Sequence, residues 1–125
     1  MRAAPARHQV TVLVVADEDA TRALLSDALR RDGYLVLSAD SARDAASYLE
    51  APTARIDLVL SDLRREGPTA LDLARLVRAT RARTPLLVVN AAPSTFRLDV
   101  LRREVLTTIV ANVKREAAEL VLKTA

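Results

Sequence analysis

The prediction of the fold starts from the segment Ile56-Asp57-Leu58-Val59-Leu60-Ser61-Asp62-Leu63. Its centre is a short aliphatic run, which is typical of a strand buried on both faces of a parallel sheet. The run ends at Asp62, and a polar loop with Gly67 and Pro68 follows. In open α/β sheets, ligands bind at the carboxyl ends of the strands. The sequence therefore predicts that Asp62 lies at the functional edge of a central strand.

Composition limits the class of protein. The chain has 125 residues, half of them apolar, which is enough for one domain with its own core. It has no cysteine, which excludes disulfides, thiol nucleophiles and cysteine metal sites. Its apolar runs are far shorter than the roughly 20 residues of a membrane span, and residues 1–19 do not form a signal peptide. We expect a cytoplasmic protein with a flexible N-terminal arm at 1–9 and one domain at 10–125.

The same kind of apolar run recurs four times along the chain. Strands are predicted at residues 10–15, 34–38, 86–89 and 107–111, in addition to the Asp62 strand. Apolar residues at helical spacing predict a helix after each strand, five in all. The expected helix starts are Asp19 or Thr21, Asp40 or Ser41, Pro68 with Thr69, and Ser94 or Thr95, and the last helix is expected to be lined by Val113, Ala117, Leu120 and Val121.

Strands that alternate with helices predict an α/β fold, in which a five-stranded parallel sheet has helices on both faces. The first, third and fourth strands are the most apolar, so we expect them in the middle of the sheet. Right-handed crossovers then give the order 2-1-3-4-5. The order reverses between strands one and three, so Asp17 and Asp62 should face each other there, with Asn90 beside Asp62.

Residues 10–124 resemble the receiver domain of two-component response regulators, a flavodoxin-like fold. The resemblance rests on three segments in the right order, with Arg22 downstream of the first: Val12-Leu13-Val14-Val15-Ala16-Asp17-Glu18, Asp57-Leu58-Val59-Leu60-Ser61-Asp62-Leu63 and Thr84-Pro85-Leu86-Leu87-Val88-Val89. The family is known for the strand order 2-1-3-4-5, so that order is not an independent inference.

The resemblance implies roles for several residues. Asp62 matches the aspartate that accepts a phosphoryl group from a histidine kinase, and Asp17 matches the second of two acidic residues that bind Mg²⁺. Ala16 stands where the first acidic residue is expected. Asn90 replaces the hydroxyl residue that ends strand four. Ala111 replaces the lysine that ends strand five, and Thr108 replaces the aromatic switch residue on that strand.

These departures concentrate at the site and are typical of a degenerate receiver, or pseudo-receiver. With only Asp17 and Asp62 as carboxylate ligands, Mg²⁺ binding should be weak or absent, because Mg²⁺ demands a complete octahedral shell. Loss of the lysine removes a positive charge beside a phosphoryl group of roughly −2 charge. Arg64 either pairs with the two aspartates in place of the missing cations or extends into solvent. Glu18 and Asp19 either supply a metal ligand or are solvated or capping residues.

Three functions follow as hypotheses. The first is a non-enzymatic docking module for a histidine kinase or another signalling protein, with the helix 4, strand 5, helix 5 face as docking surface and as a homodimer face. The second is a working phosphoacceptor, modified on Asp62 in a phosphorelay. The third is nucleic-acid binding through the arginine-rich face at net charge +3, but without interleaved aromatic residues a solvated face is favoured. The segment contains no effector domain, so it is either a stand-alone protein or a piece of a longer one.

Overall fold

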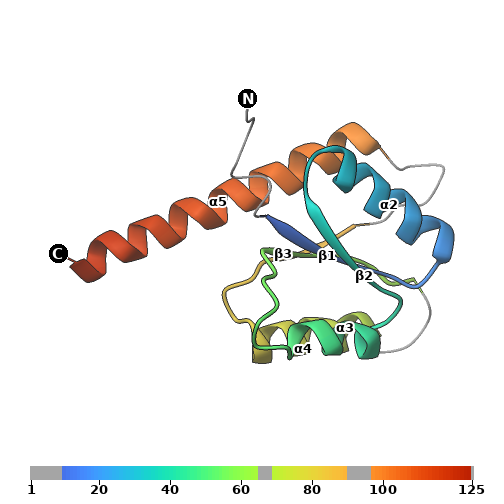
Figure 1. Cartoon of the computed structure of the whole chain (residues 1–125), viewed down its shortest axis with the longest axis horizontal. Coiled ribbons are helices and arrows are strands. Elements are labelled where there is room, and N and C mark those ends of the chain that lie inside the picture. The colour runs from blue at the N-terminus through green and yellow to red at the C-terminus, as the bar shows by residue number, and fades with distance from the viewer. Residues whose placement is uncertain (1–9, 65–68, 90–96, 125) are drawn as a thin grey trace.

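A computed structural model gives the fold (Figure 1). It describes residues 10–64, 69–89 and 97–124, and the side chains among them except those of Thr69 and of residues 113–124. The predicted arm at 1–9 and the predicted site residue Asn90 lie outside the described residues.

Four parallel strands form one sheet. They are β1 (Thr11–Ala16), β2 (Leu35–Ala39), β3 (Leu58–Asp62) and β4 (Leu86–Val88). Their spatial order is β2-β1-β3-β4, which confirms the predicted order of the first four strands. The helices are α2 (Asp19–Arg31), α3 (Ala42–Leu49), α4 (Thr69–Thr80) and α5 (Leu98–Thr124).

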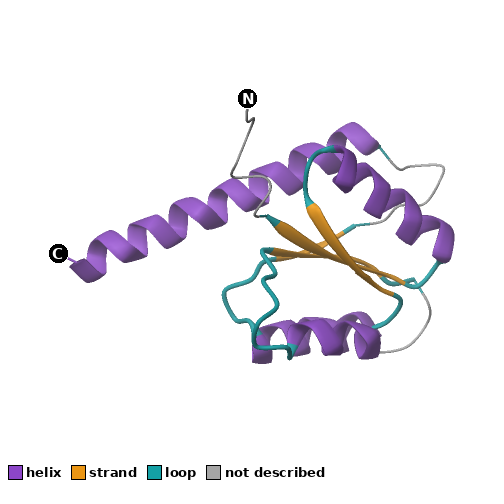
Figure 2. Ribbon diagram, in the orientation of Figure 1, coloured by secondary structure: helices purple, strands orange, loops and turns teal. Residues whose placement is uncertain are grey.

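The helices cover both faces of the sheet, as predicted (Figure 2). Successive residues of a strand point to opposite faces. On β1, Val12 and Val14 therefore pack with Leu101 and Val105 of α5 and with residues of α2. Their neighbour Leu13 packs instead in a second core with residues of α3 and α4. The two cores are mainly aliphatic, and they hold β1 and β3 in the centre of the sheet.

The predicted fifth strand is wrong. Residues 107–111 lie inside α5, which runs as one helix from Leu98 to Thr124 and replaces the two helices expected on either side of that strand. The physical reason is a helical spacing of the buried side chains on one face of α5, namely Leu101, Val105, Ile109 and Asn112. The sequence 98–124 also contains no glycine or proline that would end the helix.

This difference changes the edge of the sheet. The structure describes no strand beyond β4, which was expected in the middle of the sheet, and Val88 is exposed there. Ala111, expected at the end of strand five, lies exposed on α5. In the described residues, the expected docking face of helix 4, strand 5 and helix 5 therefore lacks its strand. The C-terminal part of α5 extends away from the sheet (Figure 1).

Local features mark where α3 begins and where α2 ends. The hydroxyl of Ser41 accepts a hydrogen bond from the backbone N–H of Asp44 over 3.0 Å, so the predicted cap of α3 is confirmed. Gly33 follows α2 with a positive φ of 95°, a conformation that glycine adopts without steric cost.

None of the helices in the described part of the chain combines the length and apolar character that a membrane span requires.

Candidate functional site

Two aspartates meet at the carboxyl edge of the central strands. Ala16 of β1 is aligned with Asp62 of β3, and Asp17 directly follows Ala16. The parallel register therefore places both carboxylates at the point where the strand order reverses. Asp62 is 3 % exposed and Asp17 is 9 % exposed. Carboxylates are rarely buried to this extent unless a charged or hydrogen-bonding partner compensates for the lost hydration.

The partner of Asp62 is Arg64. Its Nε lies 3.1 Å from Oδ1 of Asp62, and its Nη2 lies 3.3 Å from Oδ2. This two-point contact matches the planar guanidinium to the planar carboxylate, which is a strong and directional arrangement. Arg64 therefore engages both carboxylate oxygens of Asp62.

Arg64 also contacts the other two acidic residues of the site. Its backbone N–H donates to Oδ2 of Asp17 over 2.9 Å, and its Nη1 lies 3.4 Å from Oε1 of Glu18. The hydrogen bond to Asp62 raises the pKa of the Arg64 guanidinium above its ordinary value, with added attraction from Asp62, Glu18 and Asp17. The guanidinium thus occupies the electrostatic position that a cation would take among these carboxylates.

The acidic residues after Asp17 lie on the surface. Glu18 is the residue before α2, and its Oε1 accepts a long hydrogen bond from Thr21 over 3.4 Å. Asp19 pairs with Arg22 at 2.6 Å, while Nη1 of Arg22 donates to the carbonyl oxygen of Ala16 over 2.9 Å. Arg22 therefore links the start of α2 to the end of β1 and steadies the loop that carries Asp17.

The described donor set fits Mg²⁺ poorly. This ion requires an octahedral shell of oxygen ligands close to 2.1 Å and is repelled by a neighbouring positive charge. Both oxygens of Asp62 face the Arg64 guanidinium, and one oxygen of Asp17 accepts a backbone N–H. Over residues 10–64, 69–89 and 97–112, no group of three or more His, Cys, Asp or Glu side chains is placed to hold a metal ion.

The structure brings together only part of the predicted site. Asp17, Asp62 and Arg64 meet, whereas Ala111 lies on α5 and Asn90 falls outside the described residues. The sequence reasoning missed the contact of Glu18 with Arg64, although its position next to Asp17 was a usable signal. It also missed the Arg64 backbone N–H as a donor, for which the sequence holds no signal.

The strand order, the paired aspartates and the loop at Arg64 can be compared with known proteins. The sequence profile of the response regulator receiver domain matches residues 12–122. The chain belongs to this family.

Relatives and solved structures agree with this assignment. The chain is 34 % identical over 88 residues to a probable transcriptional regulatory protein of Picosynechococcus sp., covering 66 % of this chain and 35 % of that protein. It is 34 % identical over 85 residues to the transcriptional regulatory protein ResD of Bacillus subtilis, covering 67 % of this chain and 34 % of ResD. The receiver domain of the hybrid histidine kinase CckA has a TM-score of 0.68 at 25 % identity, covering 79 % of this chain and 98 % of that one.

The receiver assignment places this domain in two-component signalling. Receiver domains are generally signalling modules rather than enzymes. The chain spans about a third of the length of the two transcriptional regulators.

Proposed function

We propose that this receiver domain is degenerate and acts by docking to a signalling protein, with Arg64 taking the place of Mg²⁺. The observation that carries the proposal is the two-point contact of Arg64 with both oxygens of Asp62. The contact satisfies a buried carboxylate without a metal ion. The Asp62 carboxylate and the Arg64 guanidinium then keep their charges and their contact. A site that does not change its charge favours a fixed docking surface over a phosphorylation switch.

Charge balance at the site supports this reading. A phosphoryl group on Asp62 would bring roughly two negative charges next to Asp17 and Glu18. Before the group is transferred, the Arg64 guanidinium must leave the Asp62 oxygens, which costs the interaction described above. The residue at the position of the receiver lysine is Ala111, which carries no charge and is exposed on α5.

The partner class follows from the family. Histidine kinases and other signalling proteins bind receiver domains, and two relatives of this chain are transcriptional regulatory proteins. A partner that binds an unphosphorylated receiver must recognise the surface of that receiver. Because the fifth strand is absent from the described sheet, the surface offered here differs from that of a five-stranded receiver.

A second candidate function is a working phosphoacceptor. Asp62 keeps its place at the end of the central strand, and the side chain of Arg64 is 27 % exposed. A guanidinium that reaches solvent can rotate away from the carboxylate. It could then bind the oxygens of a transferred phosphoryl group, since arginine forms two-point contacts with phosphate as well as with carboxylate.

Incubation with acetyl phosphate and Mg²⁺, followed by intact-mass measurement, distinguishes the two candidates. If the receiver is degenerate, neither the unsubstituted chain nor Asp62→Asn gains the mass of a phosphoryl group. A gain of one phosphoryl group that Asp62→Asn abolishes would refute the degenerate reading and establish the phosphoacceptor. A competent receiver domain treated in parallel shows that the reagent is active.

A further inference from the structure

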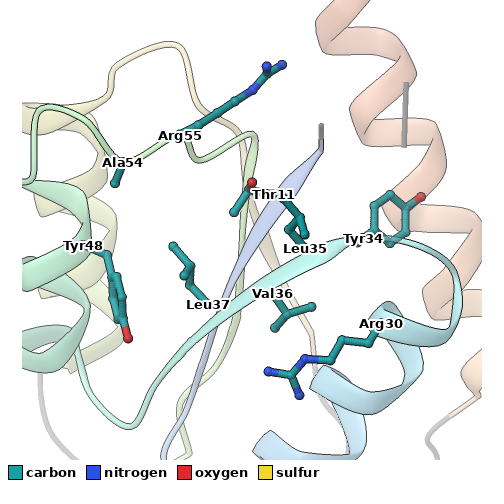
Figure 3. Close-up of a pocket in the computed structure, with 9 residues that line it drawn as sticks. All are labelled: Thr11, Arg30, Tyr34, Leu35, Val36, Leu37, Tyr48, Ala54 and Arg55. Carbon is teal, nitrogen blue, oxygen red and sulfur yellow. The ribbon is translucent and has the colours of Figure 1, made fainter. Parts of the chain in front are cut away.

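A hollow lies along the free edge of β2, at the amino ends of the strands and therefore opposite to the Asp62 site. It encloses about 570 Å³ and is lined by the start of β1, the end of α2, strand β2, and Tyr48 and Arg55 beyond it. Figure 3 shows Leu37 and Tyr48 on one side of β2 and Val36 and Arg30 on the other. The edge strand thus runs through the middle of the hollow.

Among the described strands, none pairs with the outer edge of β2. In the described sheet β2 pairs with β1, and Leu35 donates its N–H to Val10 on that side. The backbone groups of alternate residues point to opposite sides of a strand, so those of Val36 and Ser38 face away from β1. Edge strands are commonly protected by charges, prolines or bulges. The β2 sequence Leu35–Ala39 contains neither a charged residue nor proline, and Leu35 is 55 % exposed.

We propose that β2 pairs antiparallel with β2 of a second copy of this chain, so that two sheets join into one. In the register that matches the outward backbone groups, Val36 lies opposite Ser38 of the second copy. Leu37 then lies on the two-fold axis, and Leu35 lies opposite Ala39. Each copy contributes the same surface, which is the geometry of a closed two-fold dimer.

Charge complementarity selects a second copy as the occupant. The same register brings Asp40, the residue after β2, opposite Tyr34 of the other copy, next to the hollow that Tyr34 and Arg30 both line. Asp40 is exposed, and Arg30 is an exposed cation whose contact with Asp27 is long, at 3.7 Å. Exposed pairs of this kind are weak and exchange readily. Two-fold symmetry forms the Arg30 to Asp40 pair twice.

The pairing is independent of the chemistry at Asp62. It joins a five-residue edge strand to its copy, so the interface is small and the dimer should dissociate on dilution. Sedimentation velocity of the full chain over a concentration series should show a monomer at low concentration and a dimer at high concentration. Exchange of the Val36 and Ser38 amides should slow as the concentration rises. A chain that stays monomeric throughout the series would overturn the proposal.

Two substitutions test the edge itself. Leu35→Lys introduces a charge at the dimer contact, and Ser38→Pro removes an outward N–H that β1 does not use. Both should abolish the dimer while leaving the circular dichroism spectrum unchanged. Leu71→Lys is the matched control, because Leu71 is 53 % exposed on α4, and it should leave the dimer intact. A dimer that survives Leu35→Lys and Ser38→Pro uses another surface, and the proposal is then wrong.

A charge exchange tests the register. Arg30→Asp and Asp40→Arg should each weaken the dimer by roughly two- to thirtyfold, because two exposed ion pairs between the copies are lost. The double substitution Arg30→Asp with Asp40→Arg should restore dimerisation by re-forming both pairs in the opposite sense. If the double variant is as weak as the single variants, the proposed register is refuted.

Discussion

Arg64 joins the two aspartates of the site through different parts of the same residue. Its backbone N–H is 2.9 Å from Oδ2 of Asp17, and its Nε is 3.1 Å from Oδ1 of Asp62. The backbone contact fixes where the loop after β3 begins, and the side chain then has a short path back to Asp62. Displacement of the side chain alone therefore leaves the loop anchored to Asp17.

Removal of the Arg64 guanidinium should favour Mg²⁺. In Arg64→Met, the oxygens of Asp62 lose their positive partner, while the backbone contact to Asp17 is retained. We expect Mg²⁺ affinity to rise by an order of magnitude or more, because a unit charge no longer repels the ion at short range. A titration followed by NMR at Asp17 and Asp62 measures the change.

The matched control for this experiment is Arg75→Met, which removes the same charge from an exposed position on α4. It should leave Mg²⁺ affinity as in the unsubstituted chain. Equal Mg²⁺ affinity in Arg64→Met and Arg75→Met would contradict a cation-replacing role for Arg64.

The continuous helix α5 can be tested through two leucines. Leu101 is 4 % exposed in the core, and Leu106 is 43 % exposed on the same helix. Leu101→Ala should lower the free energy of unfolding by about 2–4 kcal/mol because it leaves a cavity. Leu106→Ala should change it by about 0.5 kcal/mol or less. Urea denaturation measures both values, and equal losses would contradict the described orientation of α5.

Arg81 ties the end of α3 to α4. Its Nε donates to the carbonyl oxygen of Leu49 over 3.0 Å, and its Nη2 donates to that of Ala51 over 2.8 Å. Arg81→Met should lower the free energy of unfolding by about 1–3 kcal/mol, because carbonyl groups at the helix end lose a charged donor. Thermal or urea denaturation provides the measurement. Arg78→Met, at an exposed position one turn earlier, should have little effect.

The cap of α3 gives a smaller effect. The Ser41 hydroxyl accepts the Asp44 N–H, so Ser41→Ala should lower the free energy of unfolding by about 1 kcal/mol. Ser47→Ala makes the same chemical change at an exposed position inside the helix. It should be neutral or slightly stabilising, since alanine is the better helix former. A loss of the same size in both variants would show that Ser41 does not act as a cap.

Local sequence was sufficient to locate the first four strands and the two aspartates. The runs at 12–16 in β1 and 58–60 in β3 are aliphatic and of strand length, and an aspartate lies at or just beyond the end of each strand. The same signal failed at residues 107–111. A short run of β-branched residues is compatible with a strand and with one face of a helix, and only the surroundings of the run decide between them.

By itself, the sequence determined that Asp17 and Asp62 each end a strand, because each follows an aliphatic run, and the resemblance to receiver domains supplied the strand order that makes the two strands neighbours. The tertiary structure decided two further matters. It made residues 98–124 one helix, because Leu101, Val105 and Ile109 find a buried place against the sheet only in helical spacing. It also turned Arg64 onto Asp62, because a buried carboxylate requires a partner and the fold brings that guanidinium within reach.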